Sequence, residues 1–125
     1  MATIEVSNHL DAPIRKLFGD FEYTADNWYY APWFGYFYAN SWPWILSLSH
    51  GWLKVEEEQS EAAECLHVFD FKLGAWSTSA GDYPQIKRGD GSKLRYITTE
   101  GETRTFEDGL GNAVQLPLSN DDNKS

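Results

Sequence analysis

The chain has 125 residues, of which 42% are hydrophobic and 16% aromatic, with a formal net charge of −9 and a sequence pI of about 4.6. This length suits one domain, and the aromatic residues supply enough apolar area for a core, which excludes disorder of the whole chain. The ten Lys and Arg residues form no cluster along the sequence. We therefore expect no nucleic-acid partner, because phosphate backbones bind to basic stripes.

The cysteine content and the first residues exclude further classes. Cys65 stands alone, so neither an intramolecular disulfide nor a metal site of paired cysteines is expected. Residues 1–6 lack a basic start followed by an apolar run, so no signal peptide is predicted. No apolar stretch is long enough for membrane insertion. The compartment stays open, and cell surface and virion are both compatible.

Two short elements are predicted before the aromatic part of the chain. Residues 2–6 alternate in polarity, which is typical of a strand. Residues 11–19 predict one or two helical turns, with Asp11 as the cap and Gly19 at the end.

Residues 28–55 form an aromatic block, and aromatic residues favour strands. Turn residues at 39–41 and 49–51 divide the block into predicted strands near 34–38, 44–48 and 52–56. Strand alternation would place Phe34, Tyr36 and Tyr38 on one face, with Trp33 and Phe37 on the other. Residues 56–65 are acidic and predict a solvated loop.

Short β-like segments follow the acidic loop. We predict strands at 66–71, 75–79, 84–87, 93–98, 103–106 and 113–116, separated by glycine-containing turns. Asp90-Gly91 predicts a type I′ hairpin turn, in which both central residues have positive φ.

The predicted fold class is all-β or mainly β, an antiparallel hairpin meander or stack with one short N-terminal helix. We expect a single β-rich domain over residues 1–118, an aromatic hairpin repeat region at 28–107, and a disordered polar tail at 119–125. The predicted core is Phe34, Phe37, Trp44, Leu46, Leu48, Trp52, Leu53, Phe69, Phe71, Trp76, Ile86, Leu94 and Tyr96.

Two segments of the chain superpose at an offset of 23 residues. Gly51 falls on Gly74, and the flanking matches are Ile45 with Val68, Leu46 with Phe69, Leu48 with Phe71, Leu53 with Trp76 and Val55 with Thr78. Each copy predicts a strand, a glycine turn and a second strand, and such hairpins need neighbours to bury a face. Chance similarity between two hairpins is the alternative.

The same region resembles a known aromatic repeat. The resemblance lies in Trp33 to Tyr38, Trp44-Ile45, His50 to Val55, Phe69-Asp70, Leu73 to Thr78, Tyr83-Pro84 and Gly91 to Tyr96. It is similar to a repeat of surface proteins of marine bacteria, Verrucomicrobia among them, and more distantly to the hairpin repeats of choline-binding cell-wall modules. The resemblance implies stacked aromatic hairpins and no catalytic motif. The usual pattern has more aromatics at Lys54, Val68, Ala75, Lys87 and Arg95, so a ligand-stacking role transfers poorly to the second half.

No catalytic or metal-binding constellation is predicted, and no cofactor. His9, His50 and His67 lack ligand spacing, and His50 is expected in a turn. The run Glu56 to Glu58 lacks the pattern of a calcium loop. Asp70 and Asp82 would form a carboxylate pair only if the fold joined them, and turn capping explains both.

The aromatic block is the strongest functional signal. The predicted binding residues are Trp28, Trp33, Tyr36, Tyr38, Trp42 and Trp44. Large rings with polar handles suit a protein interface or a sugar-stacking platform. We expect a non-enzymatic structural or interaction module that assembles with itself, as a homo-oligomer, or with a larger protein. The alternatives are a carbohydrate-binding module for polysaccharide, an acidic inhibitor or nucleic-acid mimic, and, as the residual class, an enzyme.

Overall fold

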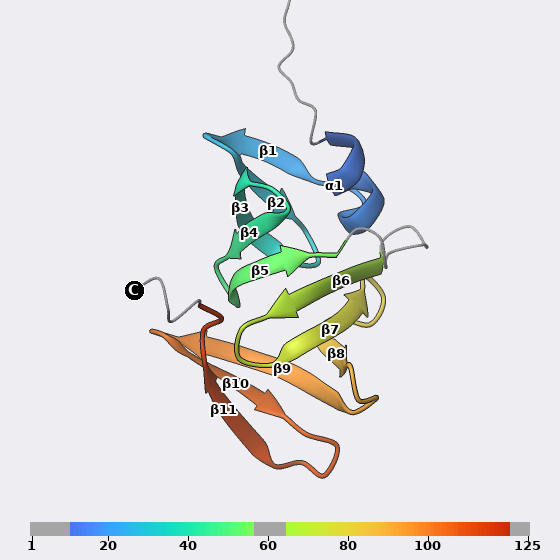
Figure 1. The fold of residues 1–125 in the computed structure, drawn as a ribbon, viewed down its shortest axis with the longest axis vertical. Helices are drawn as coiled ribbons and strands as arrows, with labels where there is room; N and C mark the ends of the chain where they lie inside the picture. Colours follow the sequence, from blue (N-terminus) through green and yellow to red (C-terminus); the bar gives the residue numbers. More distant parts are fainter. Residues whose placement is uncertain (1–10, 57–64, 121–125) are drawn as a thin grey trace, which may run out of the picture.

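The computed structural model describes residues 11–56 and 65–120. These residues form a mainly antiparallel β fold, with one helix and one open sheet of eleven strands whose order in the sheet follows their order in the chain (Figure 1). The hairpin meander predicted from the sequence is thus confirmed. The predicted strand at 2–6 and most of the acidic loop lie outside the described residues.

The helix α1 covers nearly the predicted residues, but Asp11 is its first helical residue and not a cap, since its buried Oδ1 accepts no hydrogen bond from the described residues. The helix runs over Asp11–Phe18 and ends where Gly19, at φ 76°, donates its N–H to the carbonyl of Arg15 at 2.8 Å. Ile14, Leu17 and Phe18 turn one apolar side of the helix into the core.

The first two strands were not predicted. β1 (Glu22–Ala25) and β2 (Trp28–Ala31) are joined by Asp26-Asn27, and both residues have positive φ, 53° and 71°. Two positive φ values define the two-residue type I′ hairpin. The prediction of this turn at Asp90-Gly91 is wrong, because only Gly91 has positive φ there and residues 89–92 form a longer loop.

The remaining strands match the predicted segments closely. They are β3 (Gly35–Ser41), β4 (Trp44–Ser47), β5 (Gly51–Val55), β6 (Cys65–Asp70), β7 (Gly74–Ser79), β8 (Gln85–Arg88), β9 (Lys93–Glu100), β10 (Thr103–Glu107) and β11 (Ala113–Pro117). One turn is misplaced: residues 39–41 extend β3, and the chain turns at Trp42-Pro43 instead.

The 23-residue repeat is present in the structure. Gly51 and Gly74 each begin the second strand of a hairpin, at φ 89° and 81°. Ser47 in one copy and Asp70 in the other accept hydrogen bonds from two N–H groups of the following turn. Ile45 with Val68, Leu53 with Trp76 and Val55 with Thr78 are buried in both copies, whereas Leu46 with Phe69 and Leu48 with Phe71 are not. Both hairpins therefore share one turn geometry.

The inner face of the coiled sheet gathers side chains from distant hairpins. The Phe34 ring, just before β3, lies 5.3 Å from Phe18 of α1, 5.9 Å from His50 after β4 and 5.6 Å from Tyr83 before β8. His50 in turn lies 6.3 Å from the ring of Phe106 in β10. One continuous core therefore runs along the molecule and covers both halves of the sheet.

Six of the thirteen predicted core residues are buried: Phe34, Phe37, Leu53, Trp76, Ile86 and Leu94. The prediction is wrong for Leu48 and Phe69, which are 58% and 38% exposed. Five are only half-buried: Trp44, Leu46, Trp52, Phe71 and Tyr96. Side chains on a strand alternate between its two faces. Ile45 and Val68 point into the core, so Trp44, Leu46 and Phe69 beside them point outward.

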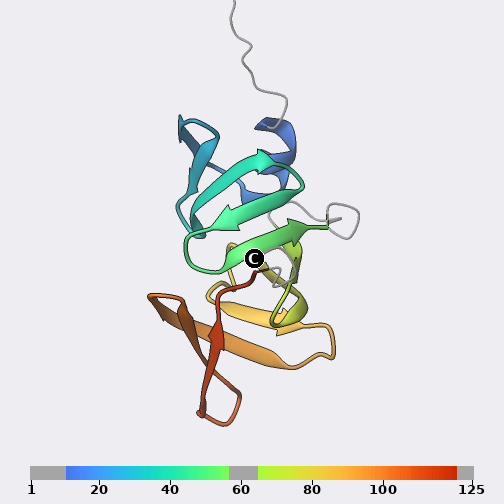
Figure 2. The ribbon, with the colours of Figure 1, turned by 60° about the vertical axis from the view of Figure 1, so that its left-hand side comes forward.

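The chain end after β11 returns to the middle of the sheet (Figure 2). Ser119 was placed in the disordered tail, and that is wrong, because it is 1% exposed. Its Oγ accepts the N–H of Phe71 at 2.8 Å and donates to the carbonyl of Trp52. Its backbone bridges to Gly51, so this residue ties β11 to the β5–β6 region.

Candidate functional site

Large apolar and aromatic side chains cover the outward side of β2–β5. In one row, Trp28 pairs across strands with Tyr38, Tyr38 with Leu46, and Leu46 with Trp52. Trp28 and Tyr38 have their ring centroids 5.2 Å apart. Cross-strand aromatic pairs of this kind stabilise the sheet while they leave ring surface facing outward.

A second row lies beside the first and is more exposed. Tyr30 pairs with Tyr36, with ring centroids 4.7 Å apart, and Tyr36 is 47% exposed. Leu48 follows β4 and is 58% exposed. We define the outer aromatic face as Trp28, Tyr30, Tyr36, Tyr38, Trp44, Leu46, Leu48 and Trp52.

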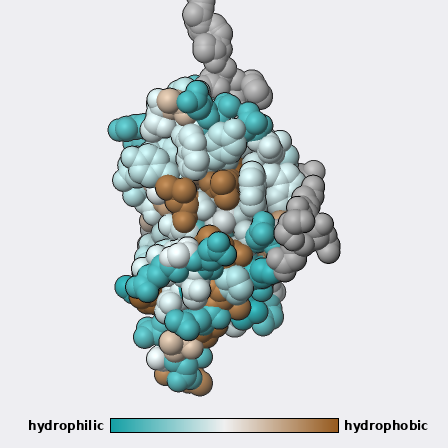
Figure 3. Space-filling model, turned by 90° about the vertical axis from the view of Figure 1, so that its left-hand side faces the viewer, coloured by the Kyte–Doolittle hydropathy of each residue, from teal (hydrophilic) through white to brown (hydrophobic). Residues whose placement is uncertain are grey.

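Trp44 connects this face to the next hairpin. Its ring stacks on Phe71 at a centroid distance of 5.3 Å and an interplanar angle of 8°. Phe71 meets Phe69 edge-on at 5.5 Å. In Figure 3, pale surface with brown patches lies in the upper middle of the molecule, with strongly hydrophilic residues along its upper edge and more of them in the lower half.

Four of the six predicted binding residues belong to this face: Trp28, Tyr36, Tyr38 and Trp44. Trp33 and Trp42 do not, because both pack against the core. The indole N–H of Trp33 donates to the carbonyl of Phe18 at 2.7 Å, and its ring meets Tyr83 edge-on at 5.6 Å. Trp33 therefore anchors α1 to the sheet and lies apart from the outer aromatic face.

A buried polar centre, which was not predicted from the sequence, lies on the opposite side of the sheet. Arg104 and Asp70 are both 0% exposed and form a two-pronged ion pair, at 2.7 and 3.1 Å. Trp76 donates its indole N–H to the same carboxylate at 3.0 Å. Arg104 Nε also donates to the carbonyl of Pro117 at 3.1 Å. The pair thus joins the β6–β7 hairpin to β10 and β11.

His50 extends this centre. Its Nδ1 lies 3.4 Å from Arg104 Nη1, which can only donate, so the ring carries its proton on Nε2 and donates to the Tyr83 hydroxyl at 2.7 Å. Burial, followed by the charge of Arg104, lowers the pKa of His50 from 6.5 to about 3, although Asp70 partly offsets this. Burial raises the pKa of Tyr83 above its ordinary value.

The polar centre suits stability better than chemistry. Burial alone would raise the pKa of Asp70, but the hydrogen bonds and charge of Arg104 lower it below its usual range. The carboxylate is therefore ionised, and His50 is neutral, at pH 7. Asp70, Arg104 and His50 are each 0% exposed, so their side chains present no atom to a substrate.

One sequence signal pointed to this centre. Capping was predicted for Asp70 and is confirmed, since its Oδ1 accepts the N–H groups of Lys72 and Leu73 at 2.9 and 3.0 Å. Arg104 was missed. It stands two residues from Phe106, which is buried, so strand alternation places it on the inward side. His50 lies in the predicted turn.

The described residues show neither a cluster of metal ligands nor a membrane-spanning helix. Within residues 11–56 and 65–120, no three His, Cys, Asp or Glu side chains gather in a way that would hold a metal ion. The helix of this part of the chain is too short and polar to cross a membrane.

Comparisons of the chain with protein-family models, with curated proteins and with solved structures found no match. The resemblance to the aromatic repeat of marine bacterial surface proteins therefore stays a prediction, and the function must be argued from the molecule itself.

Proposed function

We propose that this chain is a non-enzymatic interaction module that assembles with copies of itself through the outer aromatic face. The observation that supports this most is the composition of that face. Residues 28–55 contain no Asp or Glu, although the whole chain has 19, and Lys54 is their one charged side chain. Two copies can therefore meet here without burying a carboxylate, which would be costly.

The shape of the face supports the same proposal. Neighbouring rings on β2 and β3 lie against each other, Trp28 on Tyr38 and Tyr30 on Tyr36. Rings already held by their neighbours lose little conformational entropy when a partner covers them. Tyr and Trp are also the residues that carry most binding energy in protein interfaces.

Sedimentation velocity over a wide concentration range tests the proposal. We expect reversible self-association that strengthens as salt rises, because salt screens the repulsion between chains of net charge −9. Leu48→Glu should weaken association about tenfold or more, equivalent to about 1.4 kcal/mol. Tyr36→Ser should act in the same direction.

The matched control is Leu110→Glu. Leu110 is 88% exposed and lies in the turn before β11, outside the outer aromatic face. This variant adds the same charge, so association should change little. A wild-type chain that stays monomeric at high concentration contradicts self-assembly, and a face that then binds a larger protein would point to the other predicted partner class.

The carbohydrate alternative loses part of its original basis. Sugar stacking was predicted for Trp28, Trp33, Trp42 or Trp44, but Trp33 and Trp42 pack against the core and the Trp44 ring is stacked on Phe71. Flat rings remain on the outer aromatic face, yet they have few charged or amide neighbours. The exceptions are Lys54, which pairs with Trp44, Glu22, which borders the face beside Tyr30, and Asn40, whose Oδ1 accepts the side-chain N–H of Asn27 at 3.0 Å. Self-assembly is therefore the function we favour for this face.

A further inference from the structure

A groove follows β7 along the outward side of the sheet. The outward side chains of β7 are the small residues Ala75, Ser77 and Ser79, and the strands on either side carry longer ones. Two hollows of about 440 Å³ each lie along this strand and share Ser77 and Lys87 in their linings. We call this continuous depression the β7 groove.

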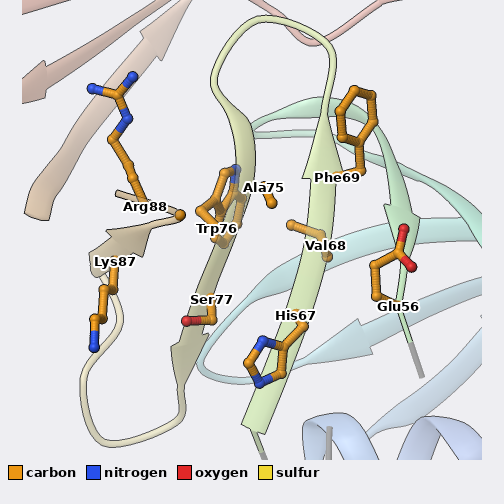
Figure 4. Close-up of a pocket in the computed structure, with 10 residues that line it drawn as sticks. Glu56, His67, Val68, Phe69, Ala75, Trp76, Ser77, Lys87 and Arg88 are labelled. Carbon is orange, nitrogen blue, oxygen red and sulfur yellow. The ribbon is translucent and has the colours of Figure 1, made fainter. Parts of the chain in front are cut away.

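The two walls of the β7 groove differ in chemistry. Figure 4 shows Phe69 and His67 of β6 on one side of β7, and Lys87 and Arg88 of β8 on the other. Phe69 is 38% exposed and pairs across strands with Ala75. Because the Ala75 side chain is small, part of the Phe69 ring faces the groove. One wall therefore offers rings and the other offers cations.

Basic residues gather on β8 and β9. Four of the ten Lys and Arg residues lie on these strands: Lys87, Arg88, Lys93 and Arg95. Lys87 pairs with Ser77 on one side and with Lys93 of β9 on the other, and Arg95 pairs with Gln85. The prediction that basic residues form no cluster is wrong here, because these four fall within residues 87–95 and lie on neighbouring strands.

Two of these cations lie near an acidic residue. Arg95 pairs across strands with Glu107. Hydrogen bonds from Ser92 and, to a smaller extent, the nearby charge of Arg88 lower the pKa of the Asp90 carboxyl. Lys87 and Lys93 instead pair with each other, and among residues 11–56 and 65–120 neither forms an ion pair. The carboxylates that line the groove are Glu56 and Asp82, in different hollows. Lys87 and Lys93 lie directly opposite each other on neighbouring strands and repel, and a bound anion would relieve this repulsion. In a chain of net charge −9, such a concentration favours an anionic ligand at this place.

The ligand is not expected to be a peptide that adds a strand. β7 is hydrogen-bonded to β6 on one side and to β8 on the other, so its backbone offers no free edge. What the β7 groove does offer is a ring face, serine hydroxyls and ammonium groups. We infer that it binds an anionic saccharide, with Phe69 against a sugar ring, Ser77 bonded to sugar hydroxyls, and Lys87 and Lys93 around a carboxylate or sulfate group. Arg88 is not part of this set, because it pairs with the buried Trp76 and its side chain points away from Lys87 (Figure 4).

This inference goes beyond the proposed self-assembly, since it concerns other strands and another ligand. Calorimetric titration would use four probes: a heparin-derived hexasaccharide for sulfate, a hexagalacturonate for carboxylate, neutral maltohexaose, and a short poly-glutamate peptide. We expect at least one anionic saccharide to bind about tenfold or more tightly than the neutral one. Binding should weaken as salt rises, opposite to self-association.

Two variants and a matched control locate the site. Lys87→Gln with Lys93→Gln should weaken saccharide binding about tenfold. Phe69→Ala should also weaken saccharide binding, but without changing its salt dependence. Arg15→Gln with Lys16→Gln removes the same charge from α1, where both side chains are exposed, and should leave binding within about twofold.

Several results would overturn the inference. They are binding of no saccharide, equal binding of neutral and anionic saccharides, and an equal loss in the α1 control. Poly-glutamate binding as tight as the saccharide and lost in the same groove variant would assign the groove to acidic peptides instead. Sedimentation of the groove variant keeps the two proposals separate, because self-association should be unchanged in it.

Discussion

The β4–β5 and β6–β7 hairpins have the same turn but different inner residues. Ser47 caps the first turn and Asp70 the second, and His50 stands where the second has Leu73. Both caps accept two backbone N–H groups, yet only the carboxylate also carries a charge. Asp70 therefore pairs with Arg104, 34 residues further along, whereas the hydrogen bonds of Ser47 stay within its own turn.

This difference shows how one copy of a repeated hairpin is positioned relative to a distant part of the fold. A neutral cap specifies only its local turn. A buried charge must be matched by a partner of opposite charge, and this requirement fixes one hairpin relative to a distant strand. Substitutions of these residues measure how much the local caps and the distant ion pair each contribute to stability.

Asp70→Ala should have the largest effect, because it leaves the buried guanidinium of Arg104 without a counter-charge. We expect a loss of about 3–5 kcal/mol in the free energy of unfolding, measured by urea denaturation. The double variant Asp70→Ser with Arg104→Met removes both charges and should recover much of this loss. If Asp70→Ala alone costs no more than a cap, the ion pair does not join the two regions.

Substitutions of the hairpin glycines Gly51 and Gly74 should have the next largest effects on stability. Comparing the two separates the cost of backbone strain from the cost of a steric clash. Both need positive φ, so Gly74→Ala should cost roughly 1–2 kcal/mol, since its added Cβ meets no atom within 4 Å. In Gly51→Ala the Cβ would also lie 2.3 Å from the carbonyl oxygen of Ser119, which raises the expected cost to roughly 2–5 kcal/mol. Equal melting temperatures for the two variants would contradict the placement of Ser119.

The pH dependence of stability distinguishes His50 from Leu73. The pKa of His50 falls from 6.5 in the unfolded chain to about 3 in the folded one, so the unfolded state binds more protons between these values. Stability should decrease as pH falls through this window, with a limiting slope of about 1.4 kcal/mol per pH unit. Asp70 has a lowered pKa too, but its contribution is lost only below its ordinary range, at the acid end.

His50→Leu, which copies Leu73, should flatten the decrease between pH 6 and about pH 4.5. Thermal unfolding of both chains over this range is the measurement. A decrease of the same slope in His50→Leu would assign the acid sensitivity to other groups.

Ser47→Ala should have the smallest effect, about 1 kcal/mol, because a local cap is lost without exposing a buried charge. Chemical denaturation of Ser47→Ala beside Asp70→Ala compares the two caps directly. A loss as large as that of Asp70→Ala would mean that the turn, and not the ion pair, dominates the second hairpin.

The strands were predictable because glycine and polar turn residues mark their ends. Gly51 and Gly74 set the repeat, and the strands around them have nearly the predicted bounds. The outward and inward sides of β4 and β6 were not predictable, since Leu46 and Ile45, or Phe69 and Val68, are apolar in adjacent places. Alternation identifies a face only where apolar and polar residues differ.

The residues that meet at the candidate sites are determined by the pairing register of the strands, and no local sequence pattern predicts that register. Tyr36 and Tyr38 were correctly assigned to one face, but Phe34, assigned to the same face, is buried against Phe37. Trp33 packs against the core and against Phe18 of α1. The pairing of Asp70 with Arg104, and of Lys87 with Lys93, follows from which strands lie side by side. A single sequence does not specify that arrangement before the fold is known.

Hydroxyl-radical footprinting at low and high protein concentration tests the central claim, that the outer aromatic face is a contact between copies. In dilute solution Tyr36, Leu48 and Leu110 should all be oxidised, because all are exposed, whereas Phe37 and Ile45 should be protected. At high concentration Tyr36 and Leu48 should become protected and Leu110 should stay reactive. Unchanged oxidation of Tyr36 and Leu48 at every concentration would contradict the claim.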